Sequence, residues 1–107
     1  MDTILIVVEP YFRSLETGRR MIGLARQLSP ERLALVTNKV RDEQELDAVH
    51  ELAASTGVEL AGVVPYDERL LAAERATTAP LDFDPRSAAV VAIGELTDRL
   101  LATARVA

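Results

Sequence analysis

The sequence contains no cysteine, which excludes disulfide bonds, thiolate metal sites and cysteine nucleophiles. It has only two tyrosines, two phenylalanines and no tryptophan, so we expect an aliphatic core. No apolar run approaches the roughly 18 residues that a membrane-spanning helix requires. No basic segment precedes the first apolar run, as it would in a secretory leader. These absences predict a cytoplasmic protein without a membrane span.

Positive charge is also scarce. Twelve Lys and Arg residues face 17 Asp and Glu residues, which gives a formal net charge of -5. A nucleic-acid partner needs a basic patch, so we expect none. A composition of 49% hydrophobic and 27% charged residues is typical of a folded globular chain, and 107 residues suit a single domain.

Apolar runs and capping residues predict the order of the elements. Three strands are expected at residues 3–9, 32–37 and 58–64, because these segments are apolar and rich in β-branched residues. Capping and breaking signals place four helices between and after them. These helices are expected from Ser14 to about Leu28, from the Asp42–Glu45 capping box to Gly57, from Asp67 to about Arg75, and from Asp84–Pro85 onward after a loop at Thr77–Phe83.

This β-α-β-α-β-α-α order predicts an α/β, three-layer Rossmann-like half domain with three parallel strands, four helices and right-handed crossovers. The first strand is as apolar as a central strand, yet no segment precedes it that could pair with its other edge. A bare apolar edge invites pairing with another chain. We therefore expect half of a domain, or a chain that depends on a partner.

Ligands of open parallel sheets bind outside the carboxyl ends of the strands. Three segments fall there, and each also has a purely structural explanation. Glu9–Pro10 can terminate a strand, Asn38–Lys39 can form a turn, and Pro65–Tyr66–Asp67 can form a loop and a helix cap.

Taken together, these segments resemble a known family. The chain is similar to MinD/ParA-type P-loop ATPases, and most similar to their CooC-type branch, which serves carbon monoxide dehydrogenase maturation. The resemblance runs in register over essentially the whole chain. It rests on Asp2–Pro10 with Arg13–Thr17, on Leu35–Val40 ending in Asn-Lys, on Leu60–Asp67 ("LAGVVPYD"), and on Pro80–Leu81 with the alanine-rich segment Ser87–Leu100. It implies that residues 1–107 are a single domain, the C-terminal half of a P-loop NTPase-like nucleotide-binding domain.

The resemblance implies roles for five residues. Asn38 matches the asparagine whose amide reads the adenine edge, a task that suits a group with both donor and acceptor. Pro65, Tyr66 and Asp67 match the segment that walls the base pocket, and Lys39 packs its stem over the rim of that pocket. Ser14, Glu16 and Thr17 match a helix near the dimer face, and no catalytic role is carried onto them.

The reactive end of such a site is missing from this sequence. No G-x-x-x-x-G-K-[ST] motif occurs, the only lysine is Lys39, and Gly18 and Gly23 before it do not fit the spacing. The nickel-binding Cys-x-Cys of the CooC branch is also missing. The resemblance therefore implies ATP or ADP bound through the adenine side only, with Mg²⁺ only where a partner supplies the P-loop.

We predict no catalytic or metal-binding residue in the chain. His50 is the sole histidine and is better explained by a structural or solvent role, and the pair Asp82 and Asp84 includes a helix cap. Two hypotheses remain open. The chain is either a partial nucleotide-binding domain that works with a separate P-loop-bearing subunit in metallocentre maturation, or a degenerate interaction module that forms a homodimer and binds no nucleotide.

Overall fold

The computed structural model describes residues 3–106 of the chain, and the side chains of residues 3–102. Its elements are β1 (Thr3–Val8), α1 (Phe12–Gln27), β2 (Arg32–Val40), α2 (Glu43–Thr56), β3 (Glu59–Pro65), α3 (Glu68–Arg75), α4 (Pro80–Phe83) and α5 (Ala88–Val106). The three strands are parallel and form one sheet in the order β1-β2-β3. The predicted α/β, Rossmann-like sheet of three parallel strands is confirmed.

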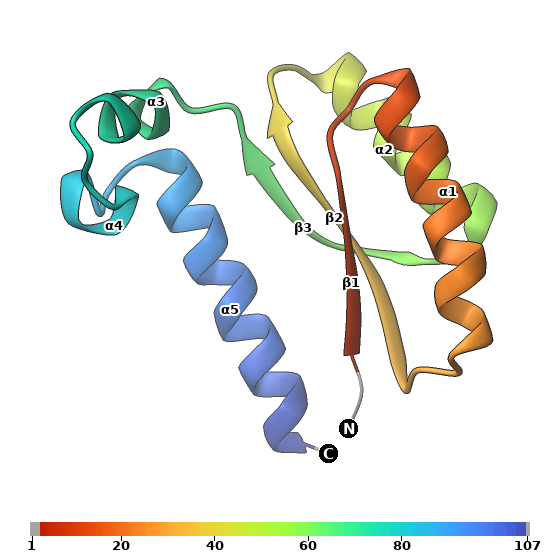
Figure 1. Cartoon of the computed structure of the whole chain (residues 1–107). Helices are drawn as coiled ribbons and strands as arrows, with labels where there is room; N and C mark the ends of the chain where they lie inside the picture. Colours follow the sequence, from red (N-terminus) through yellow and green to blue (C-terminus); the bar gives the residue numbers. More distant parts are fainter. Residues whose placement is uncertain (1–2, 107) are drawn as a thin grey trace.

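Helices cover both faces of the sheet. Helices α1 and α2 lie on one face, and α5 lies on the other (Figure 1). Alternate residues of a strand point to opposite faces, so Ile6 and Val8 of β1 pack with α1 and α2, whereas Leu5 packs on the side of α5. The buried members of the two clusters are all aliphatic, as the scarcity of aromatic residues predicts. They are Ile6, Val8, Ile22, Ala25, Leu35, Val49, Leu52 and Val58 in one cluster, and Val36, Val64 and Ala89 in the other.

Helix α5 packs closely on β3 because Gly62 has no side chain. A Cβ atom at Gly62 would lie 3.1 Å from Cδ1 of Leu96. Gly62 pairs with Val36, whereas Leu60 pairs with Leu35, so one additional residue of β3 lies in an irregularity between them. The glycine within the third apolar segment therefore marks the contact of α5 with the sheet.

The capping signals of the second helix are confirmed. Asp42 Oδ1 accepts a hydrogen bond from the amide of Glu45 at 2.8 Å, and Gly57 ends the helix in the left-handed conformation with φ of 70°. Glu45 completes the motif differently from a standard capping box. Its Oε1 accepts from the amide of Arg41, one residue before the cap, at 2.8 Å.

The predicted N-cap of the first helix is wrong. Helix α1 begins at Phe12, with Tyr11 at the cap position and no side-chain cap. Ser14 lies inside the first turn, and its Oγ accepts a hydrogen bond from the amide of Glu9 at 2.9 Å. The hydroxyl therefore satisfies the backbone at the end of β1 instead of capping α1.

The predicted start of the last helix at Asp84–Pro85 is also wrong. Helix α5 begins at Ala88, and Asp84 is instead the C-cap residue of α4. Its carboxylate accepts from Nε of Arg69 at 3.0 Å and from the amide of Arg86 at 3.2 Å. The amides in the first turn of α5 donate instead to Oγ of Ser87, from Val90 at 3.4 Å, and to Oδ2 of Asp67, which is distant in the sequence, from Ala89 at 2.9 Å.

The loop predicted at Thr77–Phe83 contains the short helix α4, so the described residues hold five helices rather than four. Pro80 occupies its first turn, where a missing amide hydrogen has no cost. The amides of Asp82 and Phe83 donate to the carbonyl of Ala79. One turn is too short to produce the 3.6-residue apolar period from which longer helices are predicted.

Candidate functional site

The carboxyl ends of the three strands bring the predicted site residues to one edge of the sheet, at the top of Figure 1. We call this region the carboxyl edge; it consists of Glu9, Tyr11, Asn38, Lys39, Arg41, Pro65, Tyr66 and Asp67. Strand β2 runs to Val40, so Asn38 and Lys39 lie within the strand, and the prediction that they follow it is wrong. Val40 pairs with Pro65, and its carbonyl accepts from the amide of Tyr66 at 2.9 Å.

A charged cluster joins the ends of β1 and β2. Nζ of Lys39 lies 2.9 Å from Oε1 of Glu9, and the hydroxyl of Tyr11 donates to Oε2 of Glu9 at 3.0 Å. The hydrogen bond from Lys39, followed by that from Tyr11, lowers the pKa of the Glu9 carboxyl below its ordinary value. The same contacts with Glu9 raise the pKa of Lys39 and that of Tyr11. Glu9 therefore stays ionised and holds the ammonium group over the ends of the strands.

The backbone at Lys39 is unusual. Its φ is 60°, in the left-handed region that residues with a Cβ rarely adopt. Oδ1 of Asn38 accepts a hydrogen bond from the amide of Lys39 at 2.9 Å, which stabilises this bend. The residues that the structure describes give the amide nitrogen of Asn38 no partner, so that donor is available to a ligand. The register between β2 and β3 shifts at the same place, between Thr37 and Val40.

Tyr66 provides an aromatic surface beside this bend. Its side chain is exposed, and the guanidinium carbon of Arg41 lies 4.8 Å from the centre of its ring. Tyr66 also contributes, as the smallest of the causes, to the raised pKa of Lys39. A planar base can stack on a tyrosine ring, so Tyr66 after β3 offers a stacking surface and Asn38 in the neighbouring β2 offers a hydrogen-bond donor.

Asp67 has a structural task in this edge. Its Oδ1 accepts from the amide of Arg69 and caps α3, and its Oδ2 accepts from the amide of Ala89 in the first turn of α5, both at 2.9 Å. The bond from Ala89 is the largest cause of the lowered pKa of Asp67, ahead of those from Arg69 and Ser87. Both oxygens are thus engaged, and a contact of this carboxylate with a ligand stays a prediction.

Sequence reasoning missed Tyr11 and Arg41. In the structure, the turn after β1 places the hydroxyl of Tyr11 within hydrogen-bonding distance of the carboxylate of Glu9, two residues earlier. Arg41 follows β2 and reaches the ring of Tyr66, the residue after β3. The available signal was the position of both residues within three residues of the end of a strand, where the carboxyl edge collects side chains.

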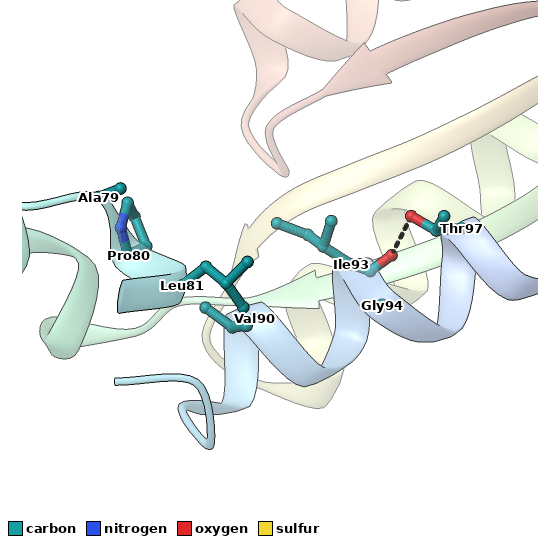
Figure 2. Close-up of a pocket in the computed structure, with 7 residues that line it drawn as sticks. All are labelled: Ala79, Pro80, Leu81, Val90, Ile93, Gly94 and Thr97. Carbon is teal, nitrogen blue, oxygen red and sulfur yellow. Dashed lines mark hydrogen bonds between the residues drawn. The ribbon is translucent and has the colours of Figure 1, made fainter. Parts of the chain in front are cut away.

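A separate hollow lies between α4 and α5, with a volume of about 410 Å³. Figure 2 shows its lining, which consists of Ala79, Pro80, Leu81, Val90, Ile93, Gly94 and Thr97. The one polar side chain, Thr97, donates its hydroxyl hydrogen to the carbonyl of Ile93 at 2.9 Å. The lining of this hollow carries no ionisable group.

The described part of the chain gathers no three His, Asp or Glu side chains that could hold a metal ion. Asp84 forms an ion pair with Arg69, and no third candidate ligand in the described residues joins Asp82 and Asp84. His50 is an exposed residue of α2. None of the helices within residues 3–106 is both long and apolar enough to cross a bilayer.

Comparison with known proteins gives consistent relatives, although no family model matches the chain. The chain is 36% identical over 88 residues to an uncharacterised ATP-binding protein of Methanocaldococcus jannaschii. The aligned residues make up 82% of this chain and 34% of that protein. It is 31% identical over 85 residues to the carbon monoxide dehydrogenase accessory protein CooC of Rhodospirillum rubrum. This alignment covers 79% of this chain and 32% of CooC.

Solved structures agree with these sequence relatives. The cell division protein MinD of Aquifex aeolicus superposes with a TM-score of 0.79 and 25% identity, over 94% of this chain and 44% of MinD. The same protein in its complex with MinC gives a TM-score of 0.78. The chain spans about a third of the length of the curated relatives it matches. These matches confirm the resemblance to MinD- and CooC-type P-loop ATPases, and the chain is homologous to part of such an ATPase.

Proposed function

We propose that this chain is the adenine-binding part of a nucleotide-binding domain, corresponding to the C-terminal half of a MinD/CooC-like ATPase. The observation that carries the proposal is the pairing of Val40 with Pro65, which brings the segment that contains Asn38 and the segment that contains the exposed Tyr66 to the same end of neighbouring strands. An ATP-binding protein among the relatives supports it.

In this proposal each residue of the carboxyl edge has a distinct role. The Asn38 amide donates to the adenine edge, while Pro65 and Tyr66 form a wall on which the base stacks. Lys39, held by Glu9, covers the rim of the pocket with its aliphatic stem. Asp67 acts indirectly, since it fixes the loop of Tyr66 to α3 and α5.

These 107 residues contain no glycine-rich phosphate cradle with its lysine and hydroxyl. The phosphates and Mg²⁺ are therefore bound by a P-loop that another polypeptide segment provides, and hydrolysis requires that segment. By its similarity to CooC, we place the assembled protein in the maturation of a metal centre, in the cytoplasm.

The test compares ligands that share the base and differ in phosphate. We expect adenosine, ADP and ATP to bind the isolated chain with equal, weak affinity, because the phosphates meet no cradle. Mg²⁺ should leave that affinity unchanged. Chemical shifts of the Asn38 side-chain amide and of the Tyr66 ring in NMR titrations report the contact directly.

Asn38→Ala should abolish adenosine binding. Gln27→Ala removes another exposed amide, at the opposite end of α1, and serves as the matched control. Titration of both signals by ATP but not by adenosine would overturn the assignment of an adenine-side pocket. No binding of any adenine compound to a folded chain would favour the second candidate, a protein-interaction module that forms homodimers. The exposed apolar residues beside β1 are the observation that keeps this candidate open.

A further inference from the structure

The two edge strands of the sheet are protected very differently. Strand β3 carries Glu59 and Pro65, and Nη1 of Arg99 donates to the carbonyl of Ala61 at 2.6 Å. Strand β1 contains no charged residue, no proline and no irregularity in its pairing with β2. Natural sheets protect exposed edges with charges, prolines or bulges, so the free edge of β1 lacks the usual protection.

Exposed apolar side chains flank this free edge on both faces of the sheet. On the face of α5, Val7 is 60% exposed, because α5 packs on β3 and leaves this end of β1 uncovered. On the other face, three side chains of α1 and its C-cap position line a hollow of about 450 Å³ with Ile4 of β1. They are Met21, Leu24 and Leu28, with exposed fractions of 47%, 64% and 74%.

These three residues lie on the flank of α1 that faces away from α2. The opposite flank is already occupied, because Arg19 donates to Oγ of Ser55 and Arg26 donates to the carbonyl of Thr56, both in α2. We call β1, with its exposed Val7, together with Met21, Leu24 and Leu28 the open edge. Exposed apolar side chains on both faces beside an unpaired strand are typical of an interaction site.

We propose that the open edge binds a polypeptide that adds a parallel strand to β1 and covers both faces with its own helices. This inference rests on the proposed function in naming that polypeptide as the rest of the nucleotide-binding domain. The relatives support it, because more than half of each relative lies outside its match with this chain. An all-apolar strand such as β1 is typical of a parallel sheet that is covered on both faces.

A second copy of the chain fits this surface less well. Two copies related by a two-fold axis would pair β1 with β1 and bring the α1 flanks together. The helix α5 of each copy would remain on its own β3, two strands away from the joint. Val7 of both copies would then stay exposed in the middle of the combined sheet. Only a partner with a helix on that face covers it.

The test uses the remainder of the Methanocaldococcus ATP-binding protein, outside its match, as the partner probe, produced in the same cells as this chain. We expect a one-to-one complex in the absence of nucleotide, measured by native mass spectrometry. Hydrogen exchange of the β1 amides should slow at least tenfold relative to the free chain, because their outward-facing half gains partners. The Val7→Lys and Leu24→Glu variants should lose the complex while keeping their circular dichroism spectrum.

Val91→Lys is the matched control. Val91 is as exposed as Met21, at 47%, but it lies on α5 and lines neither the open edge nor the adjoining hollow. A complex that tolerates Val7→Lys and Leu24→Glu as well as Val91→Lys would overturn the proposal. A dimer of this chain alone with protected β1 amides would overturn it in favour of a second copy.

If the probe is insoluble by itself, it is fused ahead of Met1 and the melting temperature of the fusion is compared with that of the chain alone. A gain that Val7→Lys removes supports the open edge, and no gain contradicts it. The readouts separate the two proposals. A complex that forms at β1 but binds no adenosine leaves the open edge standing and removes the adenine site, whereas adenosine binding without a complex does the reverse.

Discussion

Asp67 and Ala89 are joined by a hydrogen bond of 2.9 Å from the amide of Ala89 to the carboxylate of Asp67, which ties the end of β3 to the first turn of α5. The other carboxylate oxygen caps α3 through the amide of Arg69. One side chain therefore satisfies donors of two helices. The loop that presents Tyr66 is fixed on its far side by this pair of bonds.

Loss of Asp67 should cost more than loss of an ordinary helix cap. An N-cap replaced by alanine costs about 1 kcal/mol, so Asp67→Ala should lower the free energy of unfolding by about 2 kcal/mol. Asp42→Ala, which removes the cap of α2 alone, is the control and should cost about 1 kcal/mol. Urea unfolding at neutral pH measures both. Equal losses in the two variants would show that the bond to Ala89 contributes nothing.

The lowered pKa of Asp67 predicts a dependence of stability on pH. Its hydrogen bonds, first that from Ala89, hold the folded-state pKa below the ordinary value of 3.8, so the unfolded chain binds the proton more readily. The contribution of Asp67 is complete above about pH 4 and is lost as the pH falls through the folded-state pKa. Asp67→Asn should flatten the decline in stability between neutral and strongly acidic pH. A variant that declines as steeply as the natural chain would contradict this.

Replacing each of the two glycines of α1 by alanine should change the stability of the chain in opposite directions. A Cβ at Gly18 would lie 2.5 Å from Cγ1 of the buried Val8, whereas a Cβ at Gly23 meets nothing within 4 Å. Gly23→Ala should stabilise the chain by about 1 kcal/mol through helix propensity. Gly18→Ala gains the same propensity, but overpacking costs about 1 to 3 kcal/mol, so we expect a net loss. Thermal unfolding of both variants decides whether the contact with Val8 determines the difference.

The strained backbone of Lys39 predicts an unusual order of stability. Lys39→Gly and Lys39→Ala both remove the ion pair with Glu9, yet only glycine adopts a φ of 60° without strain. The glycine variant should be more stable than the alanine variant by about 1 kcal/mol. Chemical denaturation measures the difference. An alanine variant of equal or greater stability would mean that the bend straightens when the ammonium group is absent.

The elements whose signals are local in sequence are the ones predicted correctly. The apolar run of β1, the Asp42 cap and the left-handed Gly57 each depend on residues within one or two turns of each other. Errors arise where a side chain has a distant partner. Ser14 looks like a cap but bonds the end of β1, and Asp84 looks like a cap but bonds Arg69.

The candidate site follows the same division. Its location follows from the parallel strands, because their carboxyl ends must lie together. Its internal connections do not, since the contact of Glu9 with Lys39 depends on the strand register and on a left-handed bend that lysine rarely adopts. The second bond of Asp67 likewise requires the path of the chain through α3 and α4 back to α5.

The sheet order β1-β2-β3 repeats the order of the chain, and this has a consequence for how the protein folds. Each strand pairs with the one before it after a single intervening helix, so each pairing closes a loop of modest length. Assembly can therefore advance from the first strand to the last as the chain is synthesised, with each helix docking on a pair already formed. We expect the segment that carries Tyr66 and Asp67 to become ordered last, because Asp67 is fixed by the amide of Ala89 only after α5 has docked on β3. The base-recognition surface that we propose would then be complete only in a chain that has finished folding.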